Sequence, residues 1–316
     1  MSLIPHRYTR VALLGAATLT LGTAGCGGDG DGGAPASGAG AGEPLEVVAT
    51  TMQLQDFARQ VGGERVSVSG ILGPDNEPHE YEPTPSDAET LADADVVLEN
   101  GANLDDWLED LLSNAGGDAE RVTTAEGIEL LPTEEEGFPG DPHIWHDPDA
   151  AKRMVDNIAA GLSTADPDNR ETYERNAMAY KQELDGMASQ IREIFAPIPP
   201  EERKLITTHD AFGYFVRAYD LEQVGTVLPT VTTESEPSGR QVQQLVDEIR
   251  EQDVEAIFTE EAVDASLERQ IAQEAGAEVS SSLYADVLGG PGSGAEAFIA
   301  AELANAQAIV TAWQGS

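Results

Sequence analysis

A long apolar stripe in the middle of the chain limits the folds that this sequence can adopt. Over residues 173–194, apolar side chains recur at alternating steps of four and three: Tyr173, Ala177, Tyr180, Leu184, Met187, Ile191 and Ile194. That spacing is typical of one face of an α-helix. Asp166 suits an N-cap, Pro167 suits the first turn, and the Pro-rich segment 197–200 ends the pattern. We predict a helix over residues 166–196, roughly 45 Å long at ~1.5 Å per residue, with its tyrosines in the core.

A rod of this length separates two similar halves of the chain. Each half alternates buried strand-like segments with helical patterns, which predicts α/β lobes built on parallel sheets. The predicted strands are 45–51, 65–72, 95–99, 204–208, 223–228, 255–259 and 278–282. The predicted helices are 53–61, 86–94, 210–219, 238–252, 266–275 and 295–313. Ser86 with Glu89, and Ser238 with Gln241, have the spacing of capping boxes. We expect an N-terminal lobe over 45–165, the linking helix over 166–196 and a C-terminal lobe over 197–316.

The N-terminus indicates where the protein works. Arg7 and Arg10 precede an uncharged stretch, Val11–Gly25, that is too short and too rich in small residues to span a membrane. The stretch fits a secretory signal, and its end, Thr23-Ala24-Gly25-Cys26, resembles a bacterial lipobox. We predict a lipoprotein signal peptide over 1–26, acylation of Cys26, a flexible tether over 27–44 and a lipid anchor on the outer face of the cell membrane. The alternative is a signal cut elsewhere and an idle thiol.

Charge and cysteine content narrow the choice of partners. The chain has 17 Lys and Arg against 58 Asp and Glu, a formal net charge of −41. Such a surface repels nucleic acid and anionic lipid headgroups, so we expect no nucleic-acid partner. Cys26 is the only cysteine, which excludes a disulfide within the chain.

Histidines are few and fall where ligands collect. Of the five, His6 leaves with the predicted signal. His79 and His209 directly follow predicted strands, and His143 precedes a helix. Ligands of α/β proteins bind at the carboxyl ends of parallel strands, and histidine is the commonest metal ligand. We therefore expect a site shared by these three histidines.

Several segments resemble one family, the substrate-binding proteins of ABC transporters for zinc or manganese. The matching segments are EPHEYEPTPSD (77–87), DPHIWHDPD (141–149), THDAFGYFVRAYDLEQVG (208–225), EPSGRQVQQLVDEIRE (236–251), IFTEEAVDASLERQIAQEAGAEV (257–279) and LYADVLGG (283–290). The resemblance covers about residues 45–316. It implies two α/β lobes joined by one rigid helix, with a metal in the cleft between them. It also implies a monomer that captures a divalent metal outside the cytoplasm and hands it to a membrane permease, without enzymatic activity.

By the same resemblance, four residues are implied as metal ligands: His79, His143, His209 and Asp286. Three imidazoles and one carboxylate suit Zn²⁺, whereas oxygen-rich sets suit Mn²⁺, so we expect zinc with manganese as the alternative. Because bound imidazoles are neutral, affinity is expected to fall below about pH 6.5.

Five further residues are candidates to orient the ligating imidazoles, because bound histidines usually donate their other N–H to an acceptor. They are His146, Glu77, Glu80, Asp147 and Asp210. His146 lies three residues after His143, but the prolines at 142 and 148 make this segment a loop, so we expect His146 near the site or at its rim rather than as a ligand.

Two other functions are compatible with a secreted metal-binding chain. A zinc hydrolase needs an open coordination position and a nearby base, and neither HExxH nor GxSxG occurs. Assays of ester, peptide and phosphate hydrolysis separate it from a capture protein. An adhesin role is distinguished from transport by growth under chelation after gene deletion.

Overall fold

In the computed structural model, the described residues are 43–116 and 118–315. The predicted signal peptide over 1–26, Cys26 and nearly all of the predicted tether over 27–44 lie outside these ranges. Within the described ranges, no helix combines the length and the apolar character needed to cross a membrane.

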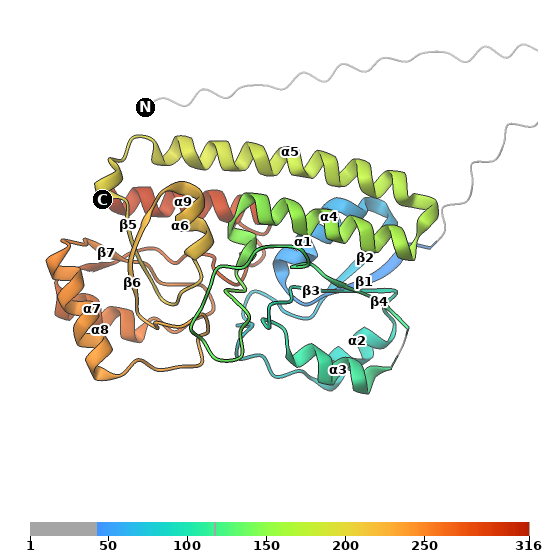
Figure 1. Cartoon of the computed structure of the whole chain (residues 1–316), viewed down its shortest axis with the longest axis horizontal. Coiled ribbons are helices and arrows are strands. Elements are labelled where there is room, and N and C mark those ends of the chain that lie inside the picture. The colour runs from blue at the N-terminus through green and yellow to red at the C-terminus, as the bar shows by residue number, and fades with distance from the viewer. Residues whose placement is uncertain (1–42, 117, 316) are drawn as a thin grey trace, which may run out of the picture. The chain divides into compact units, whose positions relative to one another are not determined.

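The central helix packs against elements from both halves of the chain (Figure 1). This helix is α5 (Arg170–Phe195), whose 26 residues at ~1.5 Å each give about 39 Å. From the first half it contacts α1 (Met52–Gly62) and α4 (Pro148–Ala165), and from the second half α6 (Gly213–Tyr219) and α9 (Phe298–Trp313). The prediction of one long helix joining two α/β halves is confirmed.

The helix begins slightly later than its capping pattern predicted. Pro167–Asn169 form a 3-10 turn, and the α-helix starts at Arg170. The carboxylate of Asp166 accepts hydrogen bonds from Asn169 Nδ2 (2.6 Å) and Tyr173 Oη (2.8 Å), so it fixes the turn that leads into the helix. The two stripe tyrosines, Tyr173 and Tyr180, lie in the core as predicted.

The first half contains a four-stranded parallel sheet in the order β2-β1-β3-β4. Its strands are β1 (Leu45–Ala49), β2 (Val66–Gly70), β3 (Val96–Glu99) and β4 (Glu120–Thr123). The first three were predicted and β4 was not, because its sequence, ERVT, has too few apolar residues to stand out from the neighbouring loops.

The second half contains two short parallel ladders. One pairs β5 (Lys204–Thr207) with β6 (Glu222–Thr226), and the other pairs β7 (Ala256–Ile257) with β8 (Glu278–Val279). The predictions of 255–259 and 278–282 are too long. Beyond Ile257 the ladder is interrupted, and pairing resumes only at an isolated bridge between Glu260 and Leu283.

The remaining helices are α2 (Pro85–Ala92), α3 (Trp107–Ala115), α7 (Gly239–Glu251) and α8 (Ser266–Ala275). The capping box predicted at Ser238 and Gln241 is confirmed at the start of α7. The box predicted at Ser86 and Glu89 is wrong: Thr84 caps α2 together with Asp87. Pro85 explains the shift. A proline is favoured at the first position of a helix, because the N–H that it lacks would have no partner within the helix there. Helix α3 was not predicted.

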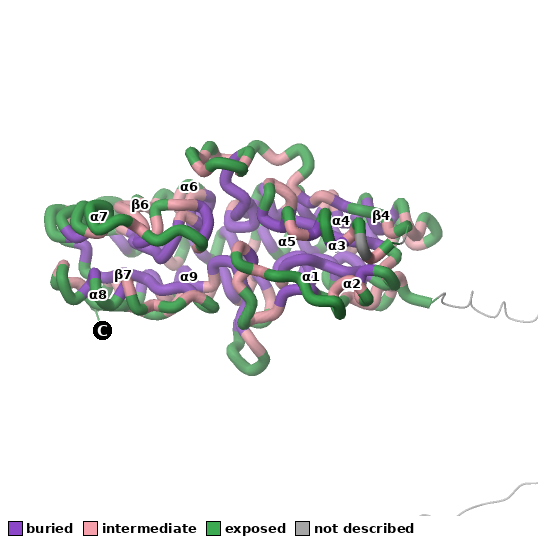
Figure 2. Tube along the Cα trace, turned by 90° about the horizontal axis from the view of Figure 1, so that it is seen from below, coloured by how far each residue is buried: buried purple, intermediate pink, exposed green. Residues whose placement is uncertain are grey.

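One hydrophobic core extends across both halves. Phe57 on α1 packs edge-to-face on Phe298 of α9, with ring centroids 4.9 Å apart, and also contacts Tyr180 of α5 at 5.9 Å. Asp56 strengthens this junction, since its carboxylate accepts the Phe298 backbone N–H (2.9 Å). Figure 2 shows buried segments in the interior beneath exposed outer helices such as α7. The two halves therefore share their packing, although the boundaries predicted for the lobes remain a prediction.

Candidate metal centre

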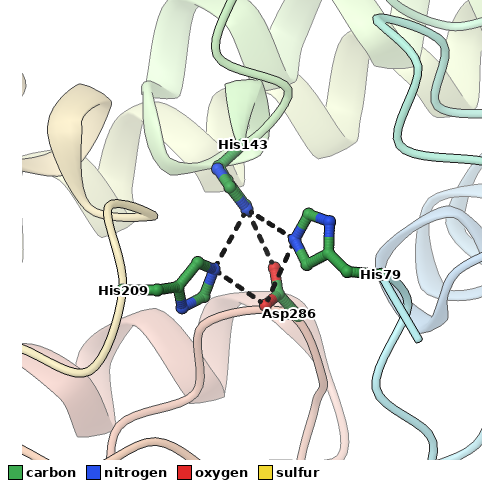
Figure 3. Close-up of side chains that lie close together, drawn as sticks. All are labelled: His79, His143, His209 and Asp286. Carbon is green, nitrogen blue, oxygen red and sulfur yellow. Dashed lines mark hydrogen bonds and ion pairs between the residues drawn. The ribbon is translucent and has the colours of Figure 1, made fainter. Parts of the chain in front are cut away.

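Four side chains from distant parts of the sequence converge on one point (Figure 3). They are those of His79, His143, His209 and Asp286, whose potential ligand atoms all lie within 4.8 Å of one another. His143 Nε2 lies 3.3 Å from His79 Nε2, 3.3 Å from His209 Nε2 and 3.3 Å from Asp286 Oδ1. Asp286 Oδ2 lies 3.2 Å from His209 Nε2 and 3.9 Å from His79 Nε2. The four residues implied by the family resemblance are thus brought together.

Loops at the ends of regular elements carry the four residues. His79 lies between β2 and α2, and His143 immediately precedes a 3-10 turn, Ile144–His146, that leads into α4. His209 follows β5, and Asp286 lies in the long loop between β8 and α9. Each half of the chain contributes two of the side chains, and each of these side chains is at most 4% exposed.

Two buried carboxylates that were not predicted hold two of the imidazoles. Asp141 accepts a hydrogen bond from His143 Nδ1 (2.8 Å), and Glu260 accepts one from His209 Nδ1 (2.5 Å). Each also accepts the backbone N–H of the same histidine. These bonds leave both Nε2 atoms directed at the shared point, as expected for ligating histidines. Asp141 could have been found from its place two residues before His143, but Glu260 is 51 residues from His209 and gives no local signal.

Burial and the neighbouring charges shift the pKa values of the three imidazoles in different directions. Burial lowers the pKa of His79 to about 3. Burial also disfavours the charged form of His143, but the charges of Asp286 and Asp141 outweigh it and raise its pKa to about 9. In the same way, Glu260 and Asp286 overcome burial and raise the pKa of His209 well above its ordinary value. The buried Asp286 in turn keeps a pKa well below its usual range, because both imidazolium groups face it.

The acidic residues predicted to orient the imidazoles do other things. Asp147 caps α4 through the Asp149 and Ala150 backbone N–H groups and pairs with Arg217 (2.9 Å). Asp210 accepts a hydrogen bond from Gln223 Nε2 (3.3 Å). No hydrogen bond joins either carboxylate to a ligand imidazole among the described residues. This part of the prediction is corrected: the segment folds so that Asp141, rather than Asp147, lies beside the His143 ring.

Glu77 and Glu80 lie on either side of His79 in the loop between β2 and α2. Glu80 is exposed, and its backbone N–H donates to Glu77 Oε2 (2.9 Å). Burial and the charge of Asp286 raise the pKa of Glu77 to about 7, so its carboxyl lies within electrostatic reach of the site. Both residues line a pocket of about 660 Å³ whose wall also contains Glu234, Glu236 and Asp264.

His146 lies apart from the four converging side chains. Its ring is buried, stacks on Phe212 with centroids 4.8 Å apart, and its Nδ1 bonds Glu302 (2.9 Å). The expectation that it is not a ligand agrees with this placement, but the expectation of a rim position does not, since the side chain is fully covered. Aromatic residues from α6 and the preceding loop close over it.

The donor set and its spacing fit a small divalent cation. In a tetrahedral site with metal–ligand bonds of about 2.0–2.1 Å, neighbouring donor atoms are about 3.3 Å apart. His143 Nε2 lies at this spacing from the other two imidazoles and from Asp286 Oδ1, and His209 Nε2 lies at it from Asp286 Oδ2, whereas His79 Nε2 lies 3.9 Å from Asp286 Oδ2. Four protein donors fill such a coordination sphere without a water, so the arrangement suits holding a metal rather than activating a nucleophile.

Comparisons with known proteins point to one group. Residues 47–312 match the family model described as zinc-uptake complex component A, periplasmic. The chain is 36% identical over 258 residues to the manganese-binding lipoprotein MntA of Halalkalibacterium halodurans, covering 81% of this chain and 84% of the relative. It is 34% identical over 247 residues to the iron-binding protein YfeA of Yersinia pestis, covering 78% of each.

Solved structures agree with these sequence matches. The periplasmic zinc-binding protein TroA from Treponema pallidum superposes with a TM-score of 0.79 at 29% identity, covering 85% of this chain and 99% of that one. A crystal structure of ZnuA superposes with a TM-score of 0.76 at 31% identity, covering 86% and 100%. The similar proteins thus share the two-lobed fold, while their names specify different metals.

Proposed function

The chain belongs to the family of zinc-uptake complex component A, the metal substrate-binding proteins of ABC transporters, and we propose that this member captures Zn²⁺ outside the cytoplasm and delivers it to a membrane permease. Proteins of this family are transport components rather than enzymes. The proposed ligands are His79, His143, His209 and Asp286. The observation that carries the proposal is the convergence of these four side chains from both halves, with their potential ligand atoms within 4.8 Å of one another.

Zinc is proposed over manganese because of the donor atoms. Three of the four are imidazole nitrogens, which suit Zn²⁺, whereas Mn²⁺ prefers carboxylate, carbonyl and water oxygens. Manganese is the second candidate, since several similar proteins are named for it, including MntA. Those relatives are also named lipoproteins, which supports a lipid anchor at Cys26 and a location on the outer face of the membrane. All four ligands come from one chain, so a monomer is sufficient for binding.

Metal analysis and competition test the proposed cargo. Protein purified without added metal is expected to contain one zinc ion per chain by elemental analysis. In competition titrations, Zn²⁺ is expected to displace bound Mn²⁺ at stoichiometric concentrations, while Mn²⁺ in large excess leaves bound Zn²⁺ in place. The reverse order of displacement would reject zinc in favour of manganese, and a protein that binds neither ion would reject metal capture.

We propose that Glu77 assists capture from the pocket side. Its carboxyl lies close enough to Asp286 and His209 for their charges to affect its pKa, and it faces the acidic pocket. Because an ionised carboxylate attracts an incoming cation, Glu77→Gln is expected to slow zinc association at a pH above the carboxyl's pKa of about 7, and to weaken binding there a few-fold, up to about 10-fold. Stopped-flow measurements at low and high salt check this, since salt screens the effect.

Glu80→Gln is the matched control for Glu77. Glu80 lines the same pocket but is exposed, so solvent and salt screen its charge and its loss is expected to change the association rate less than about two-fold. If the two substitutions slow zinc association equally, the effect comes from the overall negative charge of the pocket, and Glu77 has no special role.

A further inference from the structure

Helix α9 places two buried polar side chains against two different ligand loops. Glu302 and Asn305 are three residues apart, which puts them on the same face of the helix, and they are 2% and 1% exposed. Glu302 Oε1 bonds His146 Nδ1 at 2.9 Å. Asn305 Oδ1 accepts the Tyr284 backbone N–H, and Asn305 Nδ2 donates to the Tyr284 carbonyl, both at 2.8 Å. The rest of α9 is largely apolar, and burying polar groups in such a helix is costly unless they are hydrogen-bonded.

The Glu302 bond fixes the turn that starts at His143. His146 ends that 3-10 turn, and its backbone N–H donates to the His143 carbonyl (3.3 Å). Its ring is held between Glu302 and the face of Phe212. Movement of the His146 ring would therefore move the backbone that carries His143.

The Asn305 bonds fix the loop that carries Asp286. Tyr284, clamped at both its N–H and its carbonyl, lies two residues before Asp286. Gln53 on α1 donates to the Asp286 carbonyl (3.0 Å), and Trp145 Nε1 donates to the Ala285 carbonyl (3.2 Å). Trp145 belongs to the His143 turn, so the two ligand loops are also tied directly to each other.

From these contacts we infer that Glu302 and Asn305 are positioning residues, which set the placement of His143 relative to Asp286 and hence the geometry around the bound metal. The inference rests on the proposed function, because it assumes that these two residues bind the metal. Neither Glu302 nor Asn305 touches the metal point itself. Each of the two residues holds one of the loops that carry the proposed ligands. Because both residues belong to the same helix, a substitution on α9 is expected to change the metal geometry without touching the metal.

Substitution of Asn305, read out with Co²⁺ and Zn²⁺, tests the inference. Co²⁺ bound in place of Zn²⁺ absorbs visible light with a band position and intensity that report coordination geometry. Asn305→Ala is expected to weaken zinc binding about 10- to 100-fold, as for other residues that support metal ligands, and to alter the Co²⁺ spectrum. Glu302→Ala is expected to act in the same direction, and Glu302→Gln, which keeps an acceptor for His146, is expected to restore the wild-type spectrum.

Asn157→Ala is the matched control. Asn157 on α4 also makes two hydrogen bonds to loop carbonyls, those of Thr124 (2.8 Å) and Glu126 (2.9 Å), but that loop carries no proposed ligand. The control is expected to lower thermal stability while leaving zinc affinity and the Co²⁺ spectrum unchanged. Should Asn305→Ala not fold, Asn305→Asp replaces it, because this variant keeps the acceptor for the Tyr284 N–H while it replaces the donor by a carboxylate oxygen that repels the Tyr284 carbonyl.

The outcomes separate the inference from the proposed function. If the Asn305 variants bind metal with the affinity and spectrum of Asn157→Ala, the positioning role is overturned, although capture stands as long as Asp286→Ala abolishes binding. If the wild-type protein binds neither Zn²⁺ nor Co²⁺, or if Asp286→Ala binds normally, the proposed function itself fails.

Discussion

Asp286→Ala is expected to weaken zinc binding by about 100- to 4000-fold, the largest effect of any single substitution in the chain. Asp286 is the only anionic member of the four, and its two oxygens face all three imidazoles at 3.2–3.9 Å. Removing one partner from a buried set of charges costs about 3–5 kcal/mol, which corresponds to this loss of affinity. A competition titration against a chelator of known affinity measures the change. His79→Ala, His143→Ala and His209→Ala each remove one donor and are expected to follow the same direction.

Two further substitutions make the result specific to Asp286. Asp286→Asn keeps the shape of the side chain and removes its charge, so it separates the electrostatic contribution from packing. Asp147→Ala removes another aspartate, one that lies next to the His143 turn but caps α4 and pairs with Arg217. The substitution is expected to lower the stability of the fold, because it removes a helix cap and an ion pair. The zinc affinity is expected to stay within about three-fold of the wild-type value, because among the described residues the Asp147 side chain makes no hydrogen bond to a proposed ligand. Normal zinc binding by Asp286→Ala would contradict the proposed ligand set.

Zinc affinity is expected to rise steeply with pH up to about pH 9. In the metal-free protein the pKa of His143 is about 9 and that of His209 is well above its ordinary value, so near pH 7 both rings are protonated. Zinc binds only the neutral imidazole, and each raised pKa therefore makes binding release one proton. Two released protons give an affinity that falls by up to about 100-fold for each unit of decreasing pH. His79, with its pKa lowered to about 3, contributes nothing to this dependence.

Calorimetry in buffers with different ionisation enthalpies measures the protons released. About two per zinc are expected at pH 7, and an affinity that is constant between pH 6 and 8.5 would contradict the raised pKa values. Glu260→Gln is the control, because it removes a charge that raises the pKa of His209 and is expected to lower the number of protons released. The expectation from sequence alone, a fall in affinity below about pH 6.5, uses the ordinary pKa of histidine and omits the carboxylates that surround the rings. Affinities measured between about pH 6.5 and 9 separate the two expectations.

The sequence predicts the regular parts of this protein well because their signals are local. The spacing from Tyr173 to Ile191 marks the buried face of α5, and Ser238 with Gln241 marks the start of α7. Prediction fails where a long-range contact determines the structure. The second-half ladder stops at Ile257, and the chain then delivers Glu260 to His209, a contact that no local pattern encodes.

The same distinction applies to the site. The positions of the three histidines, two after predicted strands and one before a helix, identify the four converging side chains together with the family motifs. They do not identify what stands behind them: Glu260, Glu302 and Asn305 lie on segments that look like ordinary acidic or apolar helix and loop in the sequence. Their roles become visible only when folding brings residues 209, 146 and 284 next to them.

The packing of Phe57 against Phe298 and Tyr180 limits how cargo leaves the protein. A large rotation of one lobe away from the other would separate these three rings and expose them to water. The free-energy cost is about 25 cal/mol for each Å² of apolar surface exposed. We therefore expect unloading to proceed by loosening of individual loops while the body stays closed. A docked permease then needs to displace only one loop that carries a proposed ligand, while the packing between the two halves stays intact.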